Sequence, residues 1–368
     1  MKIRKLLSVV LAASMSSIII FSGCSTQPDE NSNAPESSVQ QSSVESSKSN
    51  ESSTEISEGS SNEESLSDDE QITPAMWKVT SANGDYMYMM GSIHLADESV
   101  NYMPDYFEEI YSECDALAVE VDINDLMEDL SSSALSMVSK MMYTDGTTIK
   151  DHISEETYDK AVELLKENNL YNSVWDYCIP YMWVSLIESK VYEKSGLDSN
   201  YGVDTVLIER ANNDNKEVLE IESFEMQMEI LTGFSDELQE LMLKSYLEDG
   251  VIDAQAEAIK QLYDKWKSGT ITAEDVNEET DEENLTEKEK ALVDEYNNTL
   301  VDERNIGMAD KAEEYIKSDD TVLMVVGAAH FYGDSGILQL MEDRGYTITQ
   351  ITSVDQLQQI NSEAANAA

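Results

Sequence analysis

The chain has 368 residues, of which 41% are hydrophobic, enough to form one substantial core. Its 75 aspartates and glutamates outnumber 23 lysines and arginines, so the formal net charge is −52. A surface of this sign repels phosphate backbones and anionic lipid head groups, which excludes nucleic acid as a partner and a basic patch as a membrane contact. Solubility is the simplest role of these charges, and a cationic ligand, a basic peptide or a divalent metal ion is compatible with them.

Residues 1–24 have the pattern of an export signal. Basic residues occupy positions 2, 4 and 5, and an apolar stretch interrupted by serines follows at 6–21, short for a bilayer span. The segment ends in Phe21-Ser22-Gly23-Cys24, which resembles the lipobox of bacterial lipoproteins. We therefore expect a lipidated Cys24 that anchors the protein at the outer face of the bacterial cytoplasmic membrane. An ordinary cleaved signal and an uncleaved anchor are the alternatives.

Residues 25–70 are an acidic, serine-rich stretch of low complexity. They hold 12 aspartates and glutamates against one lysine, for a net charge of −11. Almost nothing in this stretch is apolar, so it is expected to be a disordered tether between the membrane and a folded domain at 71–356. Residues 357–368 are expected to be a flexible tail.

Strands and helices alternate in the pattern of residues 71–356. Asn83-Gly84 lies between apolar strands at 76–80 and 85–90, the signature of a β-hairpin. Pro104 opens a helix at 105–114, and a buried strand follows at 116–122. Further strands are expected at 216–222, 321–326 and 346–351, and helices over 123–195, 201–213, 223–268, up to 317, and 337–344. The predicted fold is therefore α/β, a central mixed β-sheet with active-site loops at strand ends, flanked by helices and a large helical insertion.

Two of the three histidines occur in the same setting. His94 ends Gly91-Ser92-Ile93-His94, and His330 ends Gly327-Ala328-Ala329-His330, each directly after an apolar strand. A glycine lets the backbone turn sharply there, and open α/β sheets bind ligands just outside their strand ends. His152 has neither the glycine nor the strand and is expected on a loop or at the surface. The pair His94 and His330 therefore predicts one site built from two halves.

Carboxylates near other strand ends extend this site. Glu120 stands near the end of the strand at 116–122, and two histidines with one carboxylate resemble a divalent-metal site. Such a metal polarises a carbonyl and acidifies a bound water, and a second carboxylate can then act as general base. Glu220, Glu222 and Asp204 are candidates for that base, and Arg304 for pairing with a carboxylate or stabilising an oxyanion. Paired structural or hydrogen-bonding histidines are the alternative.

An ordered set of short motifs resembles the TraB/GumN family, which is related to the Tiki-type metalloproteases. The first family motif usually has Thr where Ser92 stands, and the family has Leu-Glu-Thr where this chain has Leu219-Glu220-Ile221, which leaves Glu222 open as a site residue. The matching pieces are Trp77-Lys78-Val79, Tyr88 to Leu95, Leu117 to Asp122, Gly202-Val203-Asp204, Leu219-Glu220 with Gln227, Glu303-Arg304-Asn305, Val326 to Gly333, Gly336 and Gly345-Tyr346.

The resemblance implies an α/β domain with both Gly-x-x-His motifs and a glutamate at the active site, and metal-dependent peptide hydrolysis for the Tiki branch. Carried over by position, it implies His94, His330 and Glu120 as metal ligands, with Glu120 also catalytic. It ranks four further residues behind them: Glu220, Arg304 and Asn305 in catalysis and Asp204 in substrate binding. Ser92 is a further candidate for substrate binding.

The expected function is thus a membrane-anchored, extracytoplasmic metallohydrolase that acts on peptides. A lipoprotein that sequesters a peptide or small ligand through the aromatic-rich helix around Trp175 and Trp183 is the alternative, and a structural envelope protein is a third. Cys114 and Cys178 are expected to be buried and unpaired, although one disulfide between them is compatible with an extracytoplasmic location.

Overall fold

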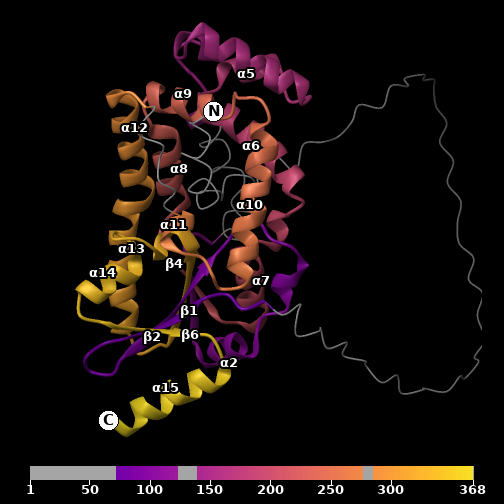
Figure 1. Ribbon diagram of the computed structural model, residues 1–368. Helices are drawn as coiled ribbons and strands as arrows, with labels where there is room; N and C mark the ends of the chain where they lie inside the picture. Colours follow the sequence, from indigo (N-terminus) through magenta and orange to yellow (C-terminus); the bar gives the residue numbers. More distant parts are fainter. Residues whose placement is uncertain (1–71, 123–138, 277–284, 368) are drawn as a thin grey trace, which may run out of the picture.

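The computed structural model describes residues 72–122, 139–276 and 285–367. The export signal with Cys24 and the acidic tether at 25–70 lie outside the described residues. The described chain is built on one sheet with helices on both faces and a helical layer beyond one end of the strands (Figure 1). The predicted fold class, α/β with a mixed sheet flanked by helices, is confirmed.

The sheet has six strands in the order β4-β3-β5-β2-β1-β6. The hairpin predicted at Asn83-Gly84 joins β1 and β2, and Gly84 takes a φ of +95°, which a side chain would disfavour. β2, β5, β3 and β4 are parallel to one another, whereas β1 is antiparallel to both of its neighbours. The strands are β1 (Met76–Thr80), β2 (Tyr86–Ser92), β3 (Ala116–Val119), β4 (Glu217–Glu220), β5 (Val322–Gly327) and β6 (Thr347–Ile351).

Both faces of the sheet are buried, because each central strand sends apolar side chains alternately to opposite sides. In β2, Tyr88 and Met90 join a cluster with α2, α7 and the end of α10, whereas Met87 and Met89 join a cluster with α13 and α14. The bounds of these helices are α2 (Asp105–Glu113), α7 (Val203–Asp214), α10 (Val251–Lys267), α13 (Glu303–Ile316) and α14 (Ile337–Asp343).

The predicted helical insertion has a core of its own, which lies beyond the C-terminal ends of the parallel strands (Figure 1). Trp183, Tyr246 and Tyr296 are fully buried in it. Its members are α5 (Glu155–Glu167), α6 (Pro180–Ser195), α8 (Phe224–Gly233), α9 (Asp236–Ser245), α12 (Glu287–Asn297), the first half of α10, and the short helices η3 (Ile149–Asp151) and η4 (Ser173–Tyr177). Trp175 and Trp183 thus help to build this core, as expected by default for that aromatic stretch.

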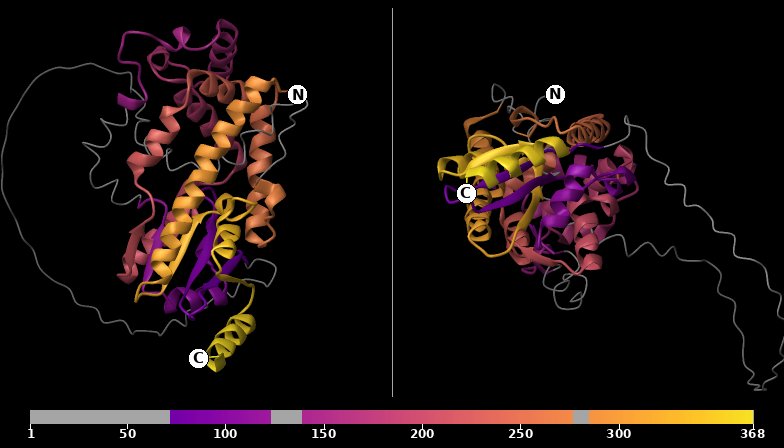
Figure 2. Two further views of the ribbon diagram at one scale, coloured as in Figure 1. Left: turned by 90° about the vertical axis from the view of Figure 1, so that its left-hand side faces the viewer. Right: turned by 90° about the horizontal axis from the view of Figure 1, so that it is seen from below.

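Two long helical rods connect the insertion to the sheet. α10 contributes Ile259 to the insertion core and Trp266 to the core beneath the sheet. The second rod runs from α12 through a π-helical turn, η7 (Asn298–Asp302), into α13, and Figure 2 shows it along the height of the molecule. The sheet and the insertion are therefore held in fixed relation where the parallel strands end.

The remaining elements are short or terminal. They are η2 (Glu98–Asn101), η5 (Ser199–Tyr201), α11 (Ala273–Val276), η8 (Ala328–Phe331) and α15 (Val354–Ala367). The expected flexible tail at 357–368 is helical through Ala367, because Leu357 is buried and Asn361 accepts a hydrogen bond from Lys78 at 2.7 Å.

The two cysteines of the described chain are buried and free, as expected, and they belong to different cores. Cys114 lies beneath the sheet and Cys178 in the helical insertion. Among the described residues, no helix combines the length and the apolar character that a membrane crossing requires.

Candidate functional site

The two Gly-x-x-His motifs lie side by side. β2 and β5 are parallel neighbours, and their register pairs Ser92 with Gly327. The turns that follow touch backbone to backbone, because a Cβ on Gly91 would lie 3.0 Å from the Cα of Ala328. The sheet thus brings His94 and His330 to one edge, as the sequence predicted.

His94 is held by the start of α7. Its Nδ1 lies 2.8 Å from Oδ2 of Asp204, and both side chains are 13% exposed. Val203 donates its backbone N–H to the carbonyl of Ile93 at 2.9 Å. Gly202 approaches so closely that an added Cβ would lie 2.6 Å from the His94 carbonyl oxygen. The Asp204 carboxylate therefore lies against the imidazole of His94, and Gly202 permits the close approach of α7 to the His94 backbone.

His330 is completely buried, and its orientation is fixed by Asn305. The Asn305 amide donates to the carbonyl of Ser335 at 2.8 Å, so its Oδ1 faces Nδ1 of His330, which donates to it at 2.6 Å. Nε2 of His330 therefore carries the lone pair, and it is buried without a hydrogen-bond partner, 3.8 Å from Oε1 of Glu120.

The environment of His330 keeps its imidazole neutral. Burial lowers the pKa of His330 to about 3, helped by the positive charge of Arg304 and by His94, and the attraction of Glu120 offsets this only in part. A neutral imidazole whose Nε2 lone pair has no partner suits a metal ligand or a hydrogen-bond acceptor, and its Nε2 carries no proton to donate at neutral pH.

Glu120 is the centre of a buried ion-pair network. Oε1 accepts the backbone N–H of Gly327 at 2.8 Å, and Oε2 accepts from Arg304 at 2.5 Å and from Gln227 at 3.0 Å. Burial alone would raise its pKa, but Arg304, His330, His94 and the Gly327 N–H outweigh burial and hold the pKa of Glu120 at about 2. Glu120 thus stays a carboxylate at physiological pH and is a weak base.

Glu222 is the second carboxylate of the network. Arg304 Nε donates to Glu222 Oε1 at 2.9 Å and Nη2 donates to its Oε2 at 2.7 Å, and Gln227 adds a bond at 2.9 Å. Two carboxylates around one guanidinium leave a formal charge of −1, all of it buried, since Glu120, Glu222 and Arg304 are each at most 8% exposed. Such a charge in a poorly hydrated place attracts a cation.

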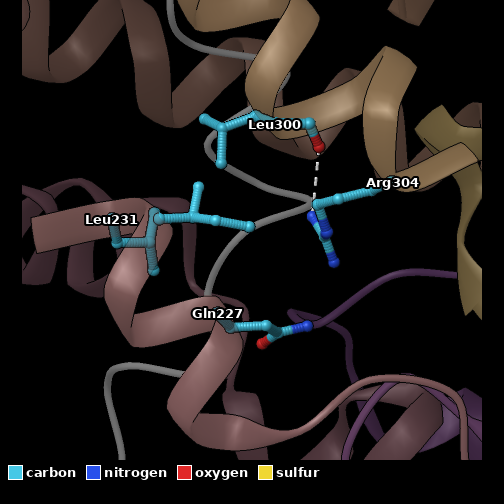
Figure 3. A pocket seen from close by; sticks show the side chains of 5 residues that line it. Gln227, Leu231, Leu300 and Arg304 are labelled. Carbon is cyan, nitrogen blue, oxygen red and sulfur yellow. Dashed lines mark hydrogen bonds between the residues drawn. The ribbon is translucent and has the colours of Figure 1, made fainter. Parts of the chain in front are cut away.

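The π-helical turn aims two consecutive residues at this site. Arg304 and Asn305 are the second and third residues after η7, and Arg304 Nη1 donates back to the carbonyl of Leu300 within that turn at 3.2 Å (Figure 3). Arg304 then reaches the carboxylates while Asn305 reaches His330. π-helical turns often mark functional sites, because they change the direction in which the following side chains point.

The other predicted residues lie at different distances from this network. Ser92 is 2% exposed and its hydroxyl has no hydrogen-bond partner. Glu220 is exposed at the end of β4, where it accepts the backbone N–H of Asp122 at 2.8 Å. Glu222, not Glu220, joins Glu120, because the Glu222 backbone N–H donates to the Glu120 carbonyl at 2.9 Å beyond the end of β4.

Sequence reasoning gave no role to Gln227 and left Glu222 open. The available signal was the helix start that separates them: Ser223 accepts the backbone N–H of Met226 as the N-cap of α8. A glutamate just before such a cap lies at the N-terminal end of the helix, with the glutamine one turn inside.

His152 lies outside the site, with its Nδ1 2.8 Å from Asp236, in agreement with its predicted exclusion.

The donor atoms decide whether a divalent metal ion fits here. His330 is held through Nδ1 by Asn305, which leaves its Nε2 unprotonated, as in many metal sites, and Nδ1 of His94 lies 2.8 Å from Asp204 Oδ2. Both oxygens of Glu120 are already hydrogen-bonded, and within the three described ranges no three His, Cys, Asp or Glu side chains are grouped to hold a metal. The described residues therefore form no grouped set of two histidines and a carboxylate, and the imidazole nitrogens of His94 and His330 are the donors that remain for an ion.

The sequence model of the TraB/PrgY/gumN family matches residues 75–350, a range that contains every residue of this site. The chain is also similar to the uncharacterized protein YbaP of Escherichia coli K12, with 22% identity over 269 residues, which cover 72% of this chain and 90% of that protein. The YbaP protein of Shigella flexneri gives the same identity and coverage. No solved structure matches the chain significantly.

Proposed function

The chain belongs to the TraB/PrgY/gumN family, and from this membership together with the site geometry we propose that it is a hydrolase of peptides that uses a divalent metal ion. His94 and His330 would hold the ion through Nε2. The observation that carries the proposal is the buried, unpartnered Nε2 of His330, whose tautomer is fixed by Asn305. A buried nitrogen lone pair without a partner is costly in a folded protein unless a ligand uses it.

A bound ion in such a site polarises the scissile carbonyl and lowers the pKa of a water. The protein's own groups prepare the place where this happens. Asp204 and Asn305 orient the two imidazoles, and Glu120 with Glu222 and Arg304 supplies a fixed net negative charge beside them. Ser92, with its buried unpartnered hydroxyl, is the group left to contact the substrate backbone.

Arg304 acts in this proposal as a positioning residue. Its Nη2 is bonded to both carboxylates and its Nη1 to the Leu300 carbonyl, so the guanidinium is committed to the protein and does not reach out to an oxyanion. Its role is to hold Glu120 ionised and in place.

We also propose the location expected from residues 1–24, a lipid anchor on Cys24 at the outer face of the cytoplasmic membrane. The motif Phe21-Ser22-Gly23-Cys24 and the basic start of the chain support it. Labelled palmitate fed to cells that express the chain should enter the wild-type protein and not Cys24→Ser; equal labelling of both would refute the anchor.

The test of the proposed chemistry uses all three histidines. The protein and its variants His94→Ala, His330→Ala and His152→Ala are equilibrated with Mn²⁺, Co²⁺ or Zn²⁺, dialysed, and assayed for bound metal and for cleavage of a mixed peptide library by mass spectrometry. Wild type and His152→Ala should retain about one ion per chain and cleave peptides, whereas the two site variants should lose both properties. Metal retained by both site variants, or a wild type that holds no ion, would refute the proposal.

A further inference from the structure

A shallow groove lies between α14 and the β6 edge of the sheet. Side chains of β1, β6 and α14 line it, together with the turn that follows His330. The groove holds about 360 Å³ that a water molecule can reach, within the range of roughly 300–1,000 Å³ that is typical of ligand-binding pockets. β6 is the edge strand of the sheet among the described residues, so no neighbouring strand covers the groove on that side.

Three aromatic rings give the groove a preformed apolar floor. Trp77 stacks on Phe331 with the ring centroids 4.9 Å apart, and Tyr332 packs edge-on against Trp77 at 6.1 Å. Trp77 and Phe331 are buried, whereas Tyr332, Leu338 of α14 and Ile348 of β6 are half-buried and face the same groove. Because the space above these side chains is already open, an occupant does not have to displace the core.

One carboxylate stands beside this apolar floor. Glu342 of α14 is exposed, and among the described residues that line the groove it is the one that carries a charge. The nearest basic residue in sequence, Arg344, is ion-paired elsewhere, with Asp310 at 2.8 Å and Glu313 at 3.6 Å. The charge of Glu342 therefore favours a cationic group in the groove and disfavours an anionic one.

Two glutamines add neutral polar groups to the lining. Gln350 of β6 is exposed, and Gln339 of α14 donates from its amide to Asp343 at 3.0 Å, which leaves its amide oxygen as an acceptor. A side-chain amide both donates and accepts hydrogen bonds, as a peptide backbone requires of its partners. A lysine or arginine within a peptide matches this lining, because its methylene stem covers apolar surface while its charged head stays at a polar rim.

We propose that this groove docks a basic peptide segment, with the stem of a lysine or arginine on the floor of Trp77, Tyr332 and Ile348 and its charged head at Glu342. The overall charge of the molecule acts in the same direction, since a net charge of −52 attracts basic chains and repels acidic ones. The proposal goes beyond the proposed function and does not depend on a bound metal or on catalysis.

The experiment observes the floor of the groove by ¹⁵N NMR of the full chain. The chain has four tryptophans, and the indole signal of Trp77 is identified by its absence in Trp77→Phe. The probes are N-acetyl-Ala-Ala-Lys-Ala-Ala-amide and the same peptide with glutamate or leucine in place of lysine. The lysine peptide should shift the Trp77 signal saturably, the leucine peptide should bind more weakly, and the glutamate peptide should not bind. Absence of a saturable shift with the lysine peptide, or equal affinity for any two of the peptides, would overturn the proposal.

Two neighbouring acidic residues of α14 provide the test variant and its control. Glu342→Gln should weaken binding of the lysine peptide by about two- to fivefold, the effect of one exposed ion pair. Asp343→Asn removes one charge from the next residue, which is exposed and outside the groove, and it should leave the affinity unchanged. Glu342→Lys should reverse the preference, so that the glutamate peptide binds more tightly than the lysine peptide. Equal weakening by Glu342→Gln and Asp343→Asn, or an unchanged preference in Glu342→Lys, would overturn the proposal.

The titrations are run in EDTA, so their outcome is independent of the metal site. If the lysine peptide binds as expected but no peptide is cleaved with any metal, the groove stands and the proposed hydrolysis fails. If the lysine peptide does not bind while His94→Ala and His330→Ala abolish cleavage, the groove fails and the proposed hydrolysis stands.

Discussion

Glu188 is a buried acid that should make the stability of the insertion depend on pH. It lies on α6, is 3% exposed, and accepts the hydroxyl of Tyr246 at 2.7 Å. No basic side chain pairs with it in the part of the chain that the structure describes. Burial raises the pKa of Glu188 to about 8, and hydrogen bonds from Tyr246 and Tyr192 oppose burial only in part.

The size of the effect follows from proton linkage. Below the ordinary pKa of 4.5 both states hold the proton, and between 4.5 and about 8 only the folded state does. The free energy of unfolding therefore falls by about 1.4 kcal/mol per pH unit over this window, or by about 5 kcal/mol in total, and the loss is complete above about pH 8. At pH 7 about 3 kcal/mol of it has already been lost.

Glu188→Gln removes this dependence, because an amide keeps the acceptor for Tyr246 and never ionises. Urea unfolding, followed by circular dichroism at constant ionic strength between pH 5 and 8, measures the difference between wild type and variant at each pH. That difference should grow in favour of the variant by about 1.4 kcal/mol per pH unit. The slope is diagnostic, since any packing cost of the amide is independent of pH.

Glu167→Gln on the exposed side of α5 is the matched control and should run parallel to wild type. The remaining acidic residues contribute equally to wild type and to both variants, so they cancel in the comparison. Parallel wild-type and Glu188→Gln curves from pH 5 to 8 would refute the reasoning.

Three further predictions concern the site. Gly202→Ala would place a Cβ 2.6 Å from the His94 carbonyl oxygen and should lower the melting temperature, and a higher melting temperature would contradict this. Gly307→Ala, in the interior of α13 with nothing within 4 Å of the added Cβ, should instead raise the free energy of unfolding by up to ~1 kcal/mol. Glu222→Ala breaks a buried ion pair and should lower the free energy of unfolding, measured in urea, by about 3 kcal/mol. Glu220→Ala, at an exposed position, should lower it by well under half as much, and equal losses would argue against the network. Asn305→Ala removes the acceptor of His330 Nδ1 and should weaken binding of Mn²⁺ or Zn²⁺ by roughly 10- to 100-fold in calorimetry. Asp236→Ala removes the partner of His152 in the same way and should leave metal binding unchanged. Unchanged affinity in Asn305→Ala would count against His330 as a ligand.

The strands were predictable because their signals are local. Alternating apolar residues around Asn83-Gly84 define β1 and β2, and the all-apolar run before Gly327 defines a strand buried on both faces. The pairing of His94 with His330 also followed, since parallel strands end at the same edge. The π-helical turn was not predictable, because residues 298–302 carry no feature that separates them from an ordinary helix.

The choice between Glu220 and Glu222 shows where sequence periodicity stops being informative. Alternation along a strand places residues two apart on the same side, so the sequence offered both as equivalent. β4 ends at Glu220, and the chain then bends while keeping two backbone bonds to the β3 side, from Ile221 to Val119 and from Glu222 to Glu120. Glu222 enters the network through that bend, which depends on tertiary contacts with Arg304 and Gln227.

The overall charge and the buried charge act on a cation in different ways. The surface carries most of the −52, and salt screens its attraction beyond ~8 Å at physiological ionic strength. The net −1 of Glu120, Glu222 and Arg304 is buried beside His330 and is screened much less. Salt should therefore slow the arrival of a cation more than it weakens the bound state. In the proposed metal site, the net charge of these three buried side chains would therefore add to the hold of the two imidazoles on the ion, whereas the acidic composition of the surface would act mainly on how fast a cation arrives.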